Sequence, residues 1–580
     1  MLSDAGHKCQ IKAEFWSMKK FLLNGLVAVF FALALAGCGG KPVNPTPKPG
    51  PSITLESQAV TVKVGKSITI TPTYSNADGA SFSWTIEGKV VSTQRNLTFS
   101  SNTVGIYYAK ITVTNSIGSA SREVKITVAE KLPPVIGFAV PQGGFSILKD
   151  SEYEFSPEVT NTDGTTYSWT IDGKEVSTSK SYKYTASQTG THTFKFTAKN
   201  EDGQASISFT VKVLEEKDMP FKWNFESDTY NYSTGRSIRI LIRDIENAFD
   251  ATFTWTLDGV KVKESSEPYY VCDEAIVGSH NLSVTMKNSF RTQSKTLKIN
   301  VCPPEGTYKR TGGKAPWNKI YEYLPAPGQF INEGFTATTM EEACAWAQKR
   351  MEAKNFVCLG AWGGYLIAGF DHSVENDGGY NLAITGNAFH NSSEPGIVWV
   401  MQDENGNGLP DDTWYELKGS DYAYETKDYA ITYYKPNAKS SVMWTASDGK
   451  SGSVDYLAAY HSQDYYYPNW VKTSSYTLYG SKLISKTKEV SKDNWINQDF
   501  GWGYADNFSE VDRLSSNDNS SGGPSDNHFK ISDAVTWDGK PANLKYIDFV
   551  KIQTAVCDKA GWIGEVSTEI LFIADYNMAK

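Results

Sequence analysis

The sequence predicts an all-β, multidomain protein: three tandem β-sandwiches followed by one large jelly-roll-like β-sandwich that carries a single helix. The chain has 580 residues, which is too long for one hydrophobic core. A short motif around a tryptophan occurs three times in the first half. Beyond residue 302, many short apolar segments alternate with long loops rich in polar and aromatic residues. Such alternation, interrupted by turn residues, is typical of antiparallel sandwiches.

Residues 1–37 predict a bacterial lipoprotein signal peptide, of which 18–37 is the functional part. Lys19 and Lys20 precede an apolar run that ends in small residues directly before Cys38. The run is shorter than the roughly 20 residues of a membrane span. We therefore expect Cys38 to be lipidated and the rest of the chain to be exported and held at a membrane. An uncleaved anchor helix is the alternative.

A Pro/Gly-rich tether follows at residues 38–51, where proline, glycine and lysine stand without apolar periodicity. This composition predicts a semi-rigid stalk. Removing the leader deletes four lysines and two acidic residues, so the net charge moves from -9 to about -11. Because phosphate binding needs a basic face, we expect no nucleic-acid partner.

The first half consists of three repeats, each centred on a tryptophan. Trp84, Trp169 and Trp255 lie in matching motifs 85 and 86 residues apart. In each motif an acidic residue and a glycine follow three residues later, which predicts a hairpin turn and a buried tryptophan on a central strand. A later alternating strand ends in asparagine: Asn115, Asn200 and Asn288. The repeats are expected at residues 52–129, 133–214 and 217–302.

These units resemble the Ig-like and PKD-like modules of bacterial surface proteins. The Trp-Asp-Phe-Gly-Asp motif of true PKD domains is missing from them, so the resemblance is to the broad class. Tandem sandwiches of this class imply a rod, and we expect the repeats to be spacers. Ligand binding by the repeats is the alternative.

The C-terminal module is expected to span residues 303–580. Thr339 and Glu342 form a capping box, and apolar residues at helical spacing predict a helix that runs to about Lys354. The expected strands are Tyr365–Asp371, Gly396–Gln402, Asp428–Tyr434, Tyr476–Ile484, Tyr546–Thr554 and Ser567–Ala574. This pattern favours a jelly-roll-like sandwich in which loops at one end form the site.

A loop rich in Asp, Asn and Gly at residues 403–412 predicts a structural calcium site. Oxygen side chains occupy alternate positions, and glycines allow the tight turn that wraps a hard cation. Trp414 stands where an EF-hand would need glutamate, so the loop is not an EF-hand. The expected ligands are Asp403, Asn405, Asn407, the carbonyl of Leu409, and Asp411 or Asp412. A polar hairpin without metal is the alternative.

Two aromatic clusters are candidates for ligand binding. They lie in residues 464–470 and 500–507, where tyrosine and tryptophan stand beside asparagine and aspartate. Consecutive tyrosines on a strand cannot all point inward, so we expect some of them to face a partner. The candidate ligand-binding residues are Tyr465, Tyr466, Tyr467, Trp470, Trp502, Tyr504 and Asn507. Packing against the module's own loops is the alternative.

The cysteines predict at most one disulfide. Cys272 and Cys302 flank an expected hairpin, and a bond between them fits an oxidising compartment. The other cysteines after the leader, Cys344, Cys358 and Cys557, have no zinc-site spacing. Buried thiols are the alternative for the whole set.

The sequence favours a binding protein over an enzyme. It lacks GxSxG, HExxH, P-loop and GxGxxG motifs in a suitable context. Acidic residues are plentiful, but nothing in the sequence marks two of them as a glycosidase pair.

Three segments of the C-terminal module carry a further resemblance: Gly396–Ser420, Gly501–Asn507 and Ile547–Val556. The module is similar to C-terminal domains of gut Bacteroidota lipoproteins described as cell-surface or PKD-domain proteins. Some of these are encoded beside outer-membrane corrinoid transporters. The resemblance implies a surface-exposed lipoprotein of the outer membrane that binds cobalamin and presents it to a transporter.

Two other classes of function stay open. A glycan-binding or glycan-degrading protein would use the same exposed aromatic residues and structural calcium, and an adhesin would bind another protein. The orientation of the anchor is open as well, because Gly39 to Pro42 replace the acidic residues that usually follow the lipidated cysteine of surface lipoproteins.

Overall fold

The computed structural model describes residues 50–55, 59–141, 143–458, 460–491, 494–514 and 524–579. The leader, the expected lipidation residue Cys38 and most of the tether lie outside the described residues. The chain divides into two compact units: the first holds residues up to Leu132 with Lys488–Ile496, and the second begins at Pro133. Within the described ranges, no helix has the length and apolar character needed to cross a membrane.

Each repeat is a sandwich of one five-stranded sheet and two two-stranded sheets. Repeat 1 contains β1 (Ser52–Thr54), β2 (Ala59–Lys63), β3 (Ser67–Ile70), β4 (Thr73–Ser75), β5 (Ser81–Ile86), β6 (Lys89–Ser92), β7 (Leu97–Ser100), β8 (Gly105–Thr114) and β9 (Ser119–Ala129). Repeat 2 contains β10 (Val135–Gly137), β11 (Phe145–Leu148), β12 (Glu152–Phe155), β13 (Glu158–Thr160), β14 (Thr166–Ile171), β15 (Lys174–Ser177), β16 (Tyr182–Thr185), β17 (Gly190–Asn200) and β18 (Gly203–Leu214). Repeat 3 contains β19 (Lys222–Asn224), β20 (Thr229–Ser233), β21 (Ile238–Leu241), β22 (Arg243–Glu246), β23 (Thr252–Leu257), β24 (Val260–Ser265), β25 (Tyr269–Cys272), β26 (Gly278–Lys287) and β27 (Thr292–Cys302).

The repeated motif has the same structure in all three sandwiches. Trp84, Trp169 and Trp255 are fully buried on β5, β14 and β23. The acidic residue and the glycine that follow adopt positive φ, for example 50° at Asp172 and 81° at Gly173. These are the angles of a two-residue hairpin turn, so the local chemistry explains the motif. The prediction of buried tryptophans on paired strands is confirmed.

The C-terminal domain combines several antiparallel sheets. A six-stranded sheet has the order β28-β30-β42-β32-β33-β41, a three-stranded sheet β40-β31-β44, and a four-stranded sheet β36-β35-β34-β37. The first two sheets share the largest core, to which β30, β42, β31 and β44 all contribute. The four-stranded sheet has a separate core with Trp362 and Tyr433. The predicted all-β class with tandem sandwiches is confirmed.

The C-terminal domain contains many short strands. They are β28 (Lys319–Leu324), β29 (Val357–Cys358), β30 (Tyr365–Glu375), β31 (Leu382–Gly386), β32 (Gly396–Met401), β33 (Trp414–Leu417), β34 (Thr426–Tyr434), β35 (Val442–Ala446), β36 (Ser451–Val454), β37 (Ser475–Lys482), β38 (Thr487–Ser491), β39 (Asn494–Asn497), β40 (Ser525–Phe529), β41 (Ala534–Val535), β42 (Tyr546–Thr554), β43 (Glu569–Ile570) and β44 (Phe572–Asp575). The last expected strand is thus divided into β43 and β44, which join different sheets.

The predicted helix is α2 (Met340–Glu352), and a four-residue helix, α3 (Tyr576–Ala579), ends the described chain. The Thr339 side chain accepts a hydrogen bond from the Glu342 amide, as an N-cap should. The carboxylate of Glu342 accepts from Thr338 rather than from Thr339, so the capping box is shifted by one residue. The buried face of α2 packs into the largest core through Ala343, Ala347 and Met351.

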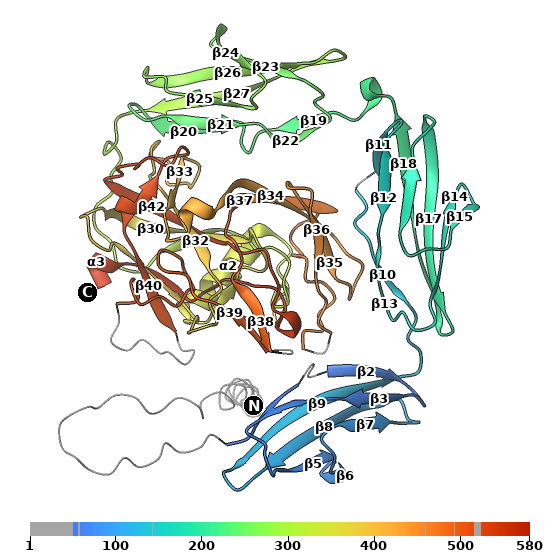
Figure 1. Ribbon diagram of the computed structural model, residues 1–580. Coiled ribbons are helices and arrows are strands. Elements are labelled where there is room, and N and C mark those ends of the chain that lie inside the picture. The colour runs from blue at the N-terminus through green and yellow to red at the C-terminus, as the bar shows by residue number, and fades with distance from the viewer. Residues whose placement is uncertain are drawn as a thin grey trace, which may run out of the picture. The chain divides into compact units, whose positions relative to one another are not determined.

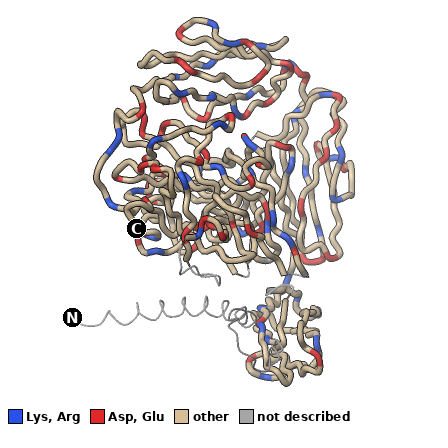
Figure 2. The backbone as a smooth tube through the Cα atoms, turned by 60° about the vertical axis from the view of Figure 1, so that its left-hand side comes forward, with Lys and Arg blue, Asp and Glu red and all other residues tan. Residues whose placement is uncertain are grey.

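Charged residues of both signs are interspersed along the described chain. Figure 2 shows lysine and arginine alternating with aspartate and glutamate over the strands and loops.

Candidate functional site

The expected calcium loop connects β32 to β33 as the end of a hairpin. The two strands pair antiparallel, with Met401 opposite Trp414. Gly406 and Gly408 both have a φ of 73°, a left-handed conformation that glycine adopts without strain. We call residues 403–413 the cation loop. The backbone amide of Asp403 donates a hydrogen bond to the buried Asp548 carboxylate on β42 at 2.8 Å. This bond anchors the start of the loop to the six-stranded sheet.

Side-chain oxygens and amides converge inside the cation loop. The Asp411 carboxylate accepts from the amide nitrogens of Asn405 and Asn407, at 3.1 and 2.9 Å. Asp403 accepts from the Gly408 amide through Oδ2 at 3.0 Å. The Asn407 Oδ1 atom accepts from the Leu409 amide at 2.7 Å. The side chains at the alternate positions are therefore bonded to one another and to the loop backbone.

Three carboxylates of the cation loop are buried and incompletely bonded. Asp403 is 2% exposed, Glu404 4% and Asp412 9%, and one oxygen of each has no hydrogen-bond partner among the described residues. Burial raises the pKa of Asp412 to about 8 and that of Glu404 to about 7. An unpaired carboxylate in this environment is costly unless a cation compensates it. Carboxylate oxygens are ligands that Ca²⁺ prefers in proteins.

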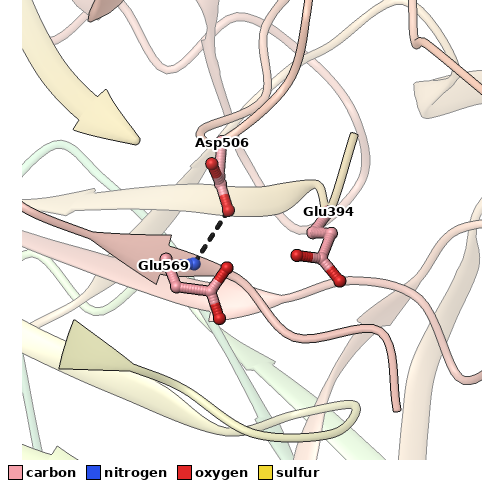
Figure 3. Close-up of side chains that lie close together, drawn as sticks. All are labelled: Glu394, Asp506 and Glu569. Carbon is pink, nitrogen blue, oxygen red and sulfur yellow. Dashed lines mark hydrogen bonds between the residues drawn. The ribbon is translucent and has the colours of Figure 1, made fainter. Parts of the chain in front are cut away.

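A second acidic cluster, which the sequence analysis missed, lies between β31, β32 and β43. Oxygen atoms of Glu394, Asp506 and Glu569 lie within 4.8 Å of one another in the described part of the chain. Figure 3 shows the three carboxylates around a common space, with the Glu569 amide donating to Asp506 at 2.8 Å. Asp506 also accepts from the amides of Asn387 and Ala388. The cluster can share protons or hold a metal ion.

The carboxyl groups of this cluster have raised pKa values, as expected where acids lie close together away from water. Burial, followed by repulsion from Glu569 and Asp506, raises the pKa of Glu394 well above its usual value. Burial raises the pKa of Asp506 to about 7. Three residues this far apart in the chain form no motif, and only Asp506 belongs to a segment that the sequence analysis singled out. No local signal could have identified the cluster.

The first aromatic cluster packs mainly inside the domain, as the alternative to ligand binding expects, and its role in ligand binding stays a prediction. Tyr466, Tyr467 and Trp470 are buried. Their polar atoms bond within the protein: the Trp470 Nε1 atom donates to the Tyr323 carbonyl, and Tyr467 donates to Thr473. The segment is a loop rather than a strand, so the side chains of consecutive tyrosines need not point to opposite faces. Tyr465 is half-buried.

The second cluster is also mainly structural. Tyr504 and Asn507 are buried, and Asn507 bonds both backbone groups of Phe500, which closes the loop between them. Both side chains are engaged within the domain, and ligand contact by these two residues stays a prediction. Trp502 is half-buried and lines a small pocket of about 180 Å³ together with Lys418 and Lys530.

A larger cleft of about 660 Å³ lies where β35 and β36 face β10 and β13 of repeat 2. Trp444 and Tyr456 line it and are half-buried. Gly452 provides the space for the indole of Trp444, because a Cβ atom there would lie 2.5 Å from the ring. Serines and charged residues surround the aromatic pair: Ser440, Ser441, Ser451, Ser453, Asp455, Lys439 and Lys559. The sequence analysis missed this cleft because Trp444 stands alone in an ordinary strand.

The predicted disulfide between Cys272 and Cys302 is absent, and both cysteines are free and buried in the described structure. Cys272 pairs with Ile238 in the small sheet of repeat 3, whereas Cys302 pairs with Ser233 at the end of the large sheet. The Cys272 sulfur contacts the Tyr232 hydroxyl at 3.4 Å. The two residues flank the hairpin in sequence but end strands of different sheets.

Comparison with known proteins identifies the first two repeats. The family of PKD-like domains matches residues 49–115 and 133–200. Human Polycystin-1 is 21% identical over 240 residues, which cover 39% of this chain and only 5% of Polycystin-1. The chain therefore contains PKD-like domains, as the resemblance of the repeats implied.

Solved structures of tandem sandwiches are also similar to parts of the chain. The fibronectin(III)-like modules of Clostridium thermocellum CbhA are 15% identical, with 28% of this chain and 94% of that chain covered and a TM-score of 0.17. Extracellular domains 3–5 of Drosophila OTK are 13% identical, with 42% and 94% covered and a TM-score of 0.18.

Proposed function

We propose that this protein is a lipid-anchored envelope protein whose C-terminal domain binds a corrinoid of the cobalamin class and presents it to an outer-membrane transporter. The observation that carries the proposal is the 660 Å³ cleft with Trp444 and Tyr456 in its wall. Its volume lies in the range of ligand sites, and it combines apolar faces with hydrogen-bonding groups.

The chemistry of the cleft suits a large, flat ligand with a polar edge. A corrinoid has a broad macrocycle whose edge carries amide groups. Trp444 can pack against the macrocycle, while Ser441, Ser453 and Asp455 can bond the amides. No protein ligand to cobalt is required in this arrangement. The protein then acts as a binder and not as an enzyme.

The rest of the chain suits the delivery of such a ligand. The expected lipid on Cys38 would hold the protein at the outer membrane, and the PKD-like repeats would act as spacers between the anchor and the binding domain. We propose display on the cell surface, where a transporter would receive the ligand. A periplasmic orientation is the alternative, because the residues after Cys38 are not the acidic ones that usually follow the lipidated cysteine of surface lipoproteins.

We also propose that the cation loop binds Ca²⁺ as a structural ion. The side chains of Asp403, Asn405, Asn407 and Asp411 would supply oxygens, with the carbonyl of Leu409 and the nearby Asp412 as further donors. Ca²⁺ would neutralise the buried carboxylates, and its role is to hold the loop rather than to contact the corrinoid. The buried, unpartnered oxygens of Asp403 and Asp412 support this proposal.

A glycan is the second candidate ligand, because Trp444 and Tyr456 could also stack on sugar rings. Equilibrium binding of cyanocobalamin to the full chain, compared with binding to a glycan array, separates the two. For a corrinoid site, we expect Trp444→Ala to weaken cyanocobalamin binding roughly tenfold or more. Tyr424→Ala is the matched control, since Tyr424 is 70% exposed and lies outside the cleft. Equal affinity of the two variants would exclude the cleft as the site.

A further inference from the structure

We propose that the cation loop is also the docking surface for repeat 3, so that Ca²⁺ in the loop holds repeat 3 against the C-terminal domain. This inference rests on the proposed calcium site. It adds a second role to the ion: the ion would set the geometry between two domains as well as the conformation of one loop.

Repeat 3 contacts the cation loop through the end of strand β20. The Ser233 amide donates to the Glu404 carboxylate at 2.7 Å. The Asn231 side chain donates to the Asp411 carbonyl at 2.9 Å, and the Thr413 hydroxyl donates to the Asn231 carbonyl at 2.9 Å. Asn231 is 3% exposed and Ser233 2%, so these polar contacts exclude water.

The docked strand is held firmly within its own repeat. Strand β20 pairs in parallel with β27, with Asn231 opposite Asn300. The Asn300 side chain donates to the Asn231 side chain at 2.8 Å. Next to this contact, Arg236 binds Glu305 at 3.0 Å and the Ala542 carbonyl at 2.8 Å. The loop therefore meets a strand that is fixed within its own repeat. Repeat 3 also contacts the C-terminal domain outside the loop, for example where Arg239 binds Asp428, so the loop governs the contacts at the end of β20.

Residues that would bind the ion and residues that dock repeat 3 alternate within the same loop. Asp403 is a candidate ligand, and the adjacent Glu404 accepts from repeat 3. The Asp411 carboxylate accepts a hydrogen bond from the Asn407 side chain within the loop, and the Asp411 carbonyl accepts one from Asn231 of repeat 3. An ion that fixes the ligand residues therefore fixes the docking groups. Without the ion, the ligand residues would lose the centre that orders them, and both docking contacts should loosen.

Hydrogen–deuterium exchange of the full chain, in Ca²⁺ and after chelation, tests this inference at the Ser233 amide. Loss of the Glu404 contact on chelation should accelerate exchange at Ser233 roughly tenfold or more, with amides of β42 as the internal reference. Asp403→Asn should show fast exchange in both conditions. Asp464→Asn is the matched control, because Asp464 is exposed and belongs to the same domain.

A second variant separates docking from metal binding. Asn231→Ala removes the donor from repeat 3 to the Asp411 carbonyl and changes no proposed ligand of the ion. This variant should keep Ca²⁺ binding, measured by calorimetry with Ca²⁺ alone, while exchange at Ser233 becomes faster even in Ca²⁺. If Ca²⁺ binds and Ser233 exchange does not respond to chelation, the docking inference is wrong and the calcium site stands. If calorimetry detects no Ca²⁺ binding to the full chain, both the calcium site and the inference are wrong.

Discussion

Trp444 and Trp470 show how burial assigns different roles to residues of the same type. Trp444 is half-buried at the edge of a cleft, over a glycine that leaves room for its ring. Trp470 is 7% exposed, and its ring lies 5.6 Å from that of Tyr323 in the main core. In sequence, Trp470 has the more suggestive neighbours, because three tyrosines stand close to it. Only the contacts of each ring decide which one can meet a ligand.

At residue scale, we expect Trp470→Ala to destabilise the C-terminal domain by about 3–5 kcal/mol, because it leaves a large cavity and an unpaired Tyr323 carbonyl. Trp444→Ala should cost much less, since its ring is partly in solvent. Urea unfolding followed by tryptophan fluorescence and circular dichroism measures both. Equal unfolding free energies for the two variants would contradict these assignments.

Glu565 provides a residue-scale test of pH dependence. Its Oε1 atom accepts from the Gln329 amide at 2.9 Å, and Oε2 has no partner in the described part of the chain. Burial raises its pKa from 4.5 to about 7. The protonated form is thus favoured by folding, and its contribution to stability is complete below pH 4.5 and is lost as the pH rises through 7.

The free energy of unfolding of the wild-type domain should therefore fall between pH 5 and pH 8. Glu565→Gln should reduce that fall by up to about 3 kcal/mol, because glutamine cannot ionise. Urea unfolding at a series of pH values measures the slope for both proteins. The unfolding free energy of the variant should still fall partly with pH, because other buried acids such as Asp506 also have raised pKa values. An unchanged slope in Glu565→Gln would mean that this carboxyl is ionised in the folded state.

At the scale of elements, the confirmed predictions depend on chemistry within a few residues. The hairpin turns follow from an acidic residue and a glycine at positive φ, and α2 begins at a threonine that caps it. The burial of the first aromatic cluster could not be predicted, because a distant residue orients its loop: the Asn332 side chain donates to the carbonyls of Tyr465 and Tyr467. Such a contact leaves no trace in the local pattern.

The cation loop gives the element-scale prediction. Ca²⁺ at a hundredfold excess over its dissociation constant should stabilise the protein by about 2.7 kcal/mol. Asp411→Asn should lose most of this effect, because Asp411 supplies the carboxylate at the centre of the loop. Thermal unfolding with Ca²⁺ and with a chelator measures the difference, and Asp464→Asn should behave as the wild type. A chelator-insensitive melting temperature in the wild-type protein would argue for a metal-free hairpin.

At the scale of the whole molecule, the sequence predicts the number and class of the sandwiches but not their contacts. The repeats are visible because the tryptophan motif returns at nearly constant spacing. The contact of Asn231 with Thr413, the cluster of Glu394, Asp506 and Glu569, and the cleft that β35 and β36 share with repeat 2 all join distant segments. Folding brings these residues together without any shared motif, so sequence patterns could not reveal them.

For the whole molecule, the proposed role of the C-terminal domain is to bind a corrinoid. Calorimetric titration of the full chain with cyanocobalamin, in Ca²⁺ and again after chelation, tests it most directly. We expect saturable binding to a single class of sites in Ca²⁺, and weaker binding after chelation if the cation loop supports the domain. Absence of heat in Ca²⁺ at high protein concentration, with saturable binding of an oligosaccharide, would contradict the corrinoid assignment and favour a glycan in the same cleft.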